Sequence, residues 1–147
     1  MYRVRKKFKF EAAHKLVSSY SKKCQKIHGH SYVVEVFLQS ETLNEDGMVI
    51  DFGQLKDCLS DIFGLLDHMT VLSDKDKSTG YIRHIEIGAM SNLGILTVPW
   101  NPTAENMAKA FYEKIAEILY RNEDMRCAEL VKVRVHETET GWAEYEE

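Results

Sequence analysis

The chain lacks the sequence features of a membrane protein, a nucleic-acid binder or a disulfide-stapled fold. Its 147 residues include no apolar run near the roughly 18 residues that a membrane-spanning helix needs. A formal net charge of −4 at pH 7 argues against binding to nucleic acid. Three irregularly spaced cysteines indicate reduced thiols in a cytoplasmic protein rather than a disulfide framework.

Segments that would divide the chain are also missing. There are two prolines, and no Pro/Gly/Ser-rich linker, low-complexity tract or internal repeat interrupts the sequence. The first ten residues alternate basic and apolar side chains, so they lack the continuous apolar core of a secretory signal. We expect a single domain over residues 1–147, long enough to bury one core.

Two strands with the same parity bring three histidines into view. Residues 2–14 carry apolar side chains at most even positions and Arg or Lys at most odd ones, and the even positions end at His14. Residues 28–38 repeat the even apolar row, which begins with His28 and His30. Because strand side chains alternate between faces, adjacent pairing of the two strands would gather the histidines at one end of one face.

The remaining periodicities predict an α+β fold. Asp51 is a candidate N-cap for an amphipathic helix over about 52–66, and Thr103 is one for a second helix of about 17 residues. Strands are expected at 130–136 and 141–145, and a hairpin at about 80–98. Helices placed between strand pairs imply an antiparallel sheet covered on one side.

The histidines are candidate metal ligands. His14, His28 and His30 offer neutral imidazole nitrogens, and three such ligands with an open fourth position suit a catalytic Zn²⁺. Cys24, four residues before His28, could instead be a fourth ligand and close a structural site. A polar turn with exposed histidines is the plainer alternative.

Other residues could carry acid–base chemistry or hold a ligand. Cys24 lies in a lysine-rich loop that favours its thiolate, so it could act as a base or nucleophile. Asp67 and His68 could form an acid–base pair, or simply a polar helix terminus. Glu137 continues the inward row of the valine-rich strand before it, so it needs either a buried cation or a ligand with an amidine-like edge.

Six segments in order resemble the 6-pyruvoyltetrahydropterin synthase / 6-carboxytetrahydropterin synthase family. This resemblance implies the tunnelling fold: a four-stranded antiparallel sheet with two helices on one face, in subunits that join into a barrel, commonly a homohexamer with active sites between subunits. The segments are FEAAH (10–14), C-x3-HGH (24–30), GMVIDF (47–52), LDH (66–68), PTAEN (102–106) and ET (137–138).

The resemblance also implies roles for individual residues. Zinc would bind the three histidines, Cys24 would work with Asp67 and His68 as a catalytic relay, and Glu137 would anchor the pterin's guanidine-like edge. Thr103 and Glu105 would lie near the same ring. Candidate partners for a substrate triphosphate, each of which could equally be a solvated loop residue, are Lys15, Lys22, Lys23 and Lys26.

The three-residue gap between the cysteine and the first histidine looks like the carboxy-forming branch of the family. That branch contains lyases of queuosine (7-deazaguanine) biosynthesis, which convert 7,8-dihydroneopterin triphosphate to 6-carboxytetrahydropterin and release acetaldehyde and triphosphate. The segment between His68 and Pro102 departs from the family, being longer by about twenty residues. A pyruvoyl-forming synthase and a non-catalytic pterin- or zinc-binding assembly protein are the alternatives.

Overall fold

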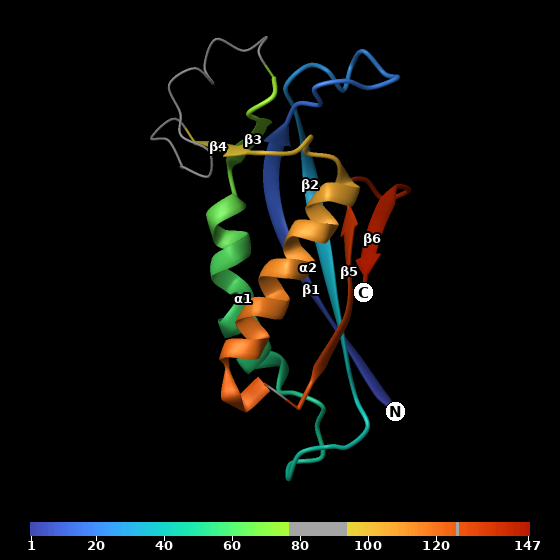
Figure 1. Cartoon of the computed structure of the whole chain (residues 1–147), viewed down its shortest axis with the longest axis vertical. Coiled ribbons are helices and arrows are strands. Elements are labelled where there is room, and N and C mark those ends of the chain that lie inside the picture. The colour runs from blue at the N-terminus through green and yellow to red at the C-terminus, as the bar shows by residue number, and fades with distance from the viewer. Residues whose placement is uncertain (77–93, 126) are drawn as a thin grey trace.

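Six strands form one mixed sheet among residues 1–76, 94–125 and 127–147, which the computed structural model describes (Figure 1). The strand order across the sheet is β4-β3-β1-β2-β5-β6. The helices are α1 (Phe52–Leu66), α2 (Ala104–Arg121) and a short 3-10 turn, η2 (Glu123–Met125). The strands are β1 (Tyr2–His14), β2 (His28–Ser40), β3 (Met69–Ser73), β4 (Ile95–Val98), β5 (Glu129–His136) and β6 (Trp142–Glu146).

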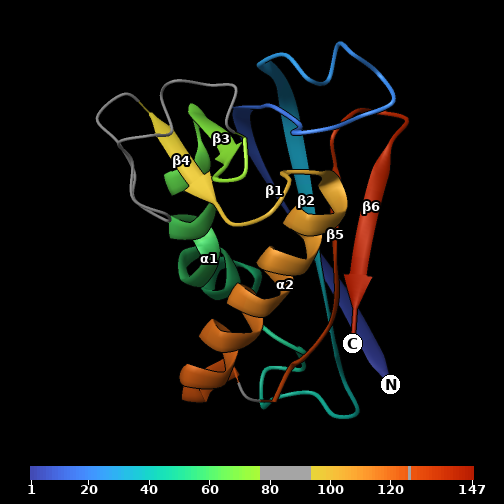
Figure 2. The same cartoon turned by 45° about the horizontal axis from the view of Figure 1, so that its top comes forward.

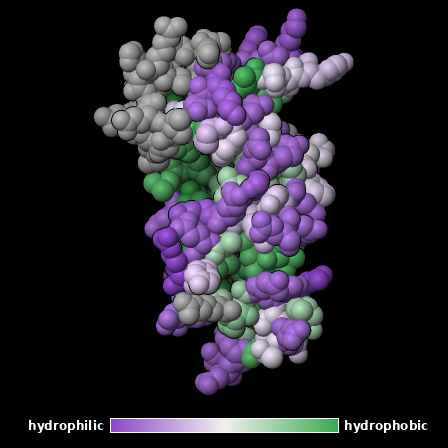
Figure 3. Space-filling model, in the orientation of Figure 1, coloured by the Kyte–Doolittle hydropathy of each residue, from purple (hydrophilic) through white to green (hydrophobic). Residues whose placement is uncertain are grey.

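Both helices pack on the same face of the sheet, as Figure 2 shows. Asp51 accepts hydrogen bonds from the first-turn amides of α1, and Thr103 accepts one from the Asn106 amide in α2, so both predicted N-caps are confirmed. The helices bury apolar residues such as Leu59 and Ile115 against the even-numbered row of β1 and β2. The outer side of the helical layer is mainly hydrophilic, with apolar side chains visible between its polar ones (Figure 3).

The pairing of β1 with β2 sets the position of the histidines. The antiparallel register runs without a break from Tyr2 opposite Ser40 to His14 opposite His28, and it places Ala12 opposite His30. An unbroken register keeps every even residue on one face. The predicted convergence of the three histidines at one end of that face is therefore confirmed.

The α+β class with two helices on one sheet face is confirmed, but the sheet is larger than the four antiparallel strands expected. Strands β3 and β4 extend it beyond β1, and both run parallel to β1. A five-residue strand is too short to show a clear alternation of apolar and polar residues, so the sequence did not predict β3. The first arm of the expected hairpin, 81–87, lies outside the described residues, whereas the second arm coincides with β4.

No helix in the ranges that the structure describes is long and apolar enough to cross a membrane.

On the uncovered face of the sheet, the odd-numbered residues of β1 form the basic row that the alternation predicted. That row is Arg3, Arg5, Lys7 and Lys9.

Candidate metal centre and active site

Three histidines meet at the end of β1 and the start of β2. One ring nitrogen from each of His14, His28 and His30 lies within 4.8 Å of the others. His14 is 1% exposed, whereas His28 and His30 are half-buried. The cluster is thus open on one side, where a further ligand of a bound ion could approach.

Backbone carbonyls orient two of the rings. The Nδ1–H of His14 donates to the Pro102 carbonyl and that of His28 donates to the Lys26 carbonyl, each at 2.7 Å. A carbonyl can only accept, so these contacts assign the proton to Nδ1 and leave a lone pair on each Nε2 of the neutral rings. The two Nε2 atoms lie 3.0 Å apart, an arrangement that repels unless a cation or a proton lies between them.

Two further observations support a metal ion at the nitrogens of the three histidines. The Nε2 atom of His30 is buried and has no hydrogen-bond partner among the described residues. Burial lowers the pKa of both His14 and His30 below the ordinary 6.5, in opposition to the nearby Glu137 carboxylate. Neutral imidazoles with free lone pairs are the form that binds metals, so this cluster can hold a metal ion.

Glu137 reaches the same cluster from β5. It follows the inward-facing Val133 and Val135, and its Oε1 lies 3.3 Å from Nε2 of His14 and 3.8 Å from Nε2 of His30. Its side chain is 31% exposed, so one edge stays open to a ligand. The expected inward position is confirmed, and in this structure the carboxylate faces histidines.

Tyr32 lies beneath the cluster and was not singled out from the sequence. Its ring contacts the rings of His14 and His30 edge-on, with centroids 6.0 and 5.6 Å apart. The side chain is 1% exposed, and its hydroxyl has no hydrogen-bond partner in the described part of the chain. The even row that begins at His28 could have identified it, because Tyr32 is the next member.

Asp67 and His68 form a defined pair at the end of α1. Asp67 accepts from the Glu11 amide at 2.8 Å and lies 2.9 Å from Nδ1 of His68, and these contacts, the first above all, lower its pKa. His68 adopts φ of +63°, and its amide donates to the Glu11 carbonyl. Its ring is 81% exposed, so within one chain it points away from the core.

The structure does not join this pair to Cys24. Cys24 is half-buried in the loop between β1 and β2, where its carbonyl accepts from the Leu16 amide at 2.9 Å. No hydrogen bond or ion pair links Cys24 with Asp67 or His68 in the ranges described above. The described residues of one chain therefore show no direct link between Cys24 and the Asp67–His68 pair.

The remaining candidates lie around the cluster in supporting positions. Thr103 caps α2, directly after the Pro102 carbonyl that orients His14, and Glu105 is exposed in the first turn of that helix. Lys15, one of the triphosphate candidates, pairs with the buried Asp76. These contacts are structural, and they do not test the expected substrate-binding roles of Thr103, Glu105 and Lys15.

An apolar pocket of about 550 Å³ between the helices and β3–β4 is separate from the histidines. Nearly all its walls are hydrocarbon, so it offers little acid–base or metal chemistry. Residues lining it include Phe10, Ile62, Leu66, Trp100, Phe111 and Lys114.

Comparison with known proteins identifies the family and agrees with the fold. The profile of 6-pyruvoyl tetrahydropterin synthase matches residues 3–147. The chain belongs to the 6-pyruvoyl tetrahydropterin synthase family. The family predicted from the sequence motifs is thereby confirmed.

Relatives within the family cover nearly the whole chain. The 6-carboxy-5,6,7,8-tetrahydropterin synthase of Aquifex aeolicus is 33% identical over 162 residues, which cover 99% of this chain and 98% of that protein. A protein of Pyrococcus horikoshii named putative 6-carboxy-5,6,7,8-tetrahydropterin synthase is 38% identical, over 92% of this chain and 83% of its own length.

Solved structures share the fold. An uncharacterized protein from Wolinella succinogenes superposes with a TM-score of 0.80 at 21% identity, covering 99% of this chain and 97% of its own. The 6-pyruvoyl tetrahydropterin synthase of Caenorhabditis elegans superposes with a TM-score of 0.69 at 25% identity, covering 99% and 95%. The tunnelling fold of this family is therefore the fold of this chain.

Proposed function

We propose that this chain is a zinc-dependent 6-carboxy-5,6,7,8-tetrahydropterin synthase, a carbon–carbon lyase of queuosine (7-deazaguanine) biosynthesis. It would convert 7,8-dihydroneopterin triphosphate and water to 6-carboxytetrahydropterin, acetaldehyde and triphosphate. The observation that carries the proposal is the three-histidine cluster with Glu137 beside it, in a chain that aligns almost end to end with relatives of that name. We place the enzyme in the cytoplasm, where its three free cysteines would stay reduced.

His14, His28 and His30 would hold the zinc through their Nε2 atoms, since Nδ1 of His14 and of His28 is already committed to a carbonyl. When bound, zinc supplies Lewis-acid polarisation of the substrate's side-chain oxygens. Pro102 and Lys26 act through the rings that they orient, because a fixed tautomer leaves the metal-binding nitrogen free.

Protein side chains would move the protons. Cys24, as a thiolate, is the proposed base on one face of the substrate side chain, and His68, oriented by Asp67, exchanges protons on the other. The Asp67 carboxylate is ionised because the Glu11 amide and His68 lower its pKa, so it can hold the imidazole in one orientation. Glu137 would bind the pterin's guanidine-like edge, with Thr103 and Glu105 near the ring.

A second copy of the chain would complete each site. The ring of His68 is mostly exposed, and no hydrogen bond or ion pair joins it to Cys24 among the described residues, which supports a site shared between subunits of a homohexamer. Such an assembly would bring the Asp67–His68 pair of one subunit to the Cys24 of another.

Identification of the pterin product tests the proposal. Purified protein loaded with zinc is incubated with 7,8-dihydroneopterin triphosphate, and the pterin is identified by mass spectrometry. We expect 6-carboxytetrahydropterin. A 6-pyruvoyl product would assign the chain to the pyruvoyl-forming synthases instead, and unchanged substrate would favour a non-catalytic binding protein.

A further inference from the structure

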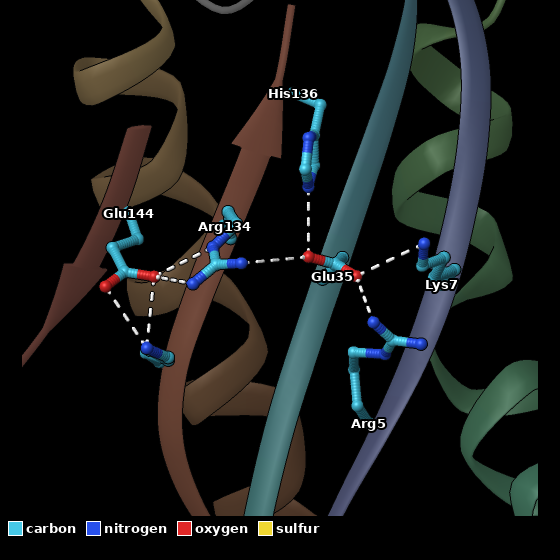
Figure 4. Close-up of polar contacts among 7 residues, drawn as sticks. Arg5, Lys7, Glu35, Arg134, His136 and Glu144 are labelled. Carbon is cyan, nitrogen blue, oxygen red and sulfur yellow. Dashed lines mark hydrogen bonds and ion pairs between the residues drawn. The ribbon is translucent and has the colours of Figure 1, made fainter. Parts of the chain in front are cut away.

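Glu35 is a buried carboxylate on the sheet face that the helices leave uncovered. It projects from β2 between basic side chains of β1 and β5 (Figure 4). Because strand side chains alternate, it lies on the face opposite His30 and Tyr32, and it is 2% exposed. A carboxylate at that depth is costly unless cations and hydrogen bonds compensate for its lost hydration. We therefore expect cations and hydrogen-bond donors around Glu35, which an exposed carboxylate on a strand would not require.

Basic residues from both neighbouring strands surround the Glu35 carboxylate. Arg5 and Lys7 of β1 lie 2.7 and 3.4 Å from Oε1, and Arg134 and His136 of β5 lie 3.6 and 2.9 Å from Oε2. Burial on its own would raise the pKa of Glu35. The hydrogen bonds of His136 and Lys7 and the charge of Arg5 outweigh that effect and lower it, so the carboxylate is ionised.

The contact with His136 connects this group to the metal centre. In the β2–β5 register Glu35 lies opposite Arg134, and Val33 lies opposite His136, which is the last paired residue of β5. Glu137 comes next, and because strand side chains alternate, it leaves the strand on the opposite face, toward His14. Glu35 thus hydrogen-bonds to His136, the residue directly before Glu137.

The partners of Glu35 differ in how much they depend on it. Arg134 also pairs with Glu144 at 2.7 Å, and Arg5 and Lys7 are about half exposed and can be hydrated. For the His136 ring, the structure gives one hydrogen-bond partner in the described part of the chain, the Glu35 carboxylate. Loss of Glu35 would therefore be felt most at His136.

We propose that Glu35 is a positioning residue of the active site: its hydrogen bond to His136 fixes the end of β5 and so holds Glu137 at the histidine cluster. In the described part of the chain Glu35 makes no hydrogen bond or ion pair with the three histidines of the cluster, which lie on the other face of the sheet, and it acts through His136. The inference rests on the proposed function in one respect, namely that Glu137 binds the pterin.

The test compares four variants in the full-length, zinc-loaded protein. Glu35→Gln removes the charge, His136→Leu removes the hydrogen-bond donor, and His136→Gln keeps an N–H donor at the place of Nε2. Glu144→Gln is the matched control, since it removes a carboxylate on the same sheet face that pairs with Arg134 but forms no hydrogen bond or ion pair with His136 among the described residues.

Kinetics and hydrogen exchange are measured on each variant. We expect Glu35→Gln and His136→Leu to raise KM for 7,8-dihydroneopterin triphosphate by about tenfold, with a smaller change in kcat and an unchanged zinc content, because a displaced anchor weakens substrate binding. The Glu137 amide, which donates to the Gly141 carbonyl, should exchange faster in both. His136→Gln and Glu144→Gln should behave like the wild type.

Each contrary outcome is distinct. Wild-type KM and wild-type exchange at Glu137 in Glu35→Gln and His136→Leu would overturn the positioning role, and loss of zinc would overturn it in favour of a role in the metal site. An equal KM increase in Glu144→Gln would mean that the KM of Glu35→Gln rises because negative charge is lost from the sheet face, and not because the hydrogen bond to His136 is lost. If the wild type converts no substrate, the proposed function fails, and the exchange rates still decide whether Glu35 fixes Glu137.

Discussion

Removal of zinc should destabilise the protein and leave its histidine cluster in an unfavourable state. Without an ion, two Nε2 lone pairs face each other at 3.0 Å, and Nε2 of His30 is buried without a hydrogen-bond partner among the described residues, a defect that costs about 1–3 kcal/mol. Free zinc at about a thousand times its Kd would stabilise the fold by about 4 kcal/mol. At roughly 2–4 °C per kcal/mol for a chain of this size, Tm should rise by roughly 8–16 °C.

The zinc-free protein should also lose stability in acid. Burial lowers the pKa of His14 and His30 in the folded state, so below pH 6.5 the unfolded chain binds more protons than the folded chain does. Stability then rises with pH across that window: this contribution is present above pH 6.5 and is lost as the pH falls toward the lowered pKa values.

Thermal unfolding with and without a chelator, at pH values from 5 to 8, measures both effects. His14→Ala should abolish the zinc-dependent shift in Tm, whereas His136→Gln, at a histidine outside the cluster, should retain it. An unchanged Tm of the wild type on addition of zinc, or the same shift in His14→Ala, would refute a metal site at these histidines. Greater stability of the zinc-free protein on acidification would refute the lowered pKa values of His14 and His30.

Three further substitutions test separate parts of the structure. Tyr32→Phe removes a buried hydroxyl for which the described part of the chain offers no hydrogen-bond partner, so the free energy of unfolding in urea should stay the same or rise by about 1 kcal/mol. Asp51→Ala removes the cap of α1 and should lower that free energy by about 1 kcal/mol, while Asp57→Ala, exposed on the same helix, should change it little. Glu137→Gln should keep zinc bound but raise KM at least tenfold, as seen by metal analysis and steady-state kinetics.

Each of these has a contrary result. A loss of more than 1 kcal/mol in Tyr32→Phe would mean that the hydroxyl has a partner, such as a buried water. Equal effects of Asp51→Ala and Asp57→Ala would remove the capping role. Loss of zinc from Glu137→Gln would make that carboxylate a fourth metal ligand rather than a substrate anchor.

The histidine cluster could be predicted from the sequence because it depends on one simple property. Side chains alternate along a strand, and no bulge interrupts the pairing of β1 with β2, so the even parity of His14, His28 and His30 survives into the structure. The positions of Asp51 and Thr103 were equally local, since an N-cap acts on amides two or three residues away.

Other features depend on neighbours that are remote in the sequence. Strand β3 is defined by parallel pairing with β1 and β4, not by its own five residues. The alternation put Glu35 on the uncovered face, and its burial arises from Arg5, thirty residues before it, and His136, 101 residues after it. Periodicity also does not describe the loop that carries Cys24 or the positive φ of His68.

The ratio of acetaldehyde to triphosphate released from 7,8-dihydroneopterin triphosphate is the most direct test of zinc-dependent carbon–carbon cleavage. Comparing the wild type with Cys24→Ala tests whether Cys24 is the base. We predict a ratio of one for the zinc-loaded wild type, and release of neither product by Cys24→Ala with its zinc still bound. Triphosphate without acetaldehyde from the wild type, or full release of both by Cys24→Ala, would contradict the account.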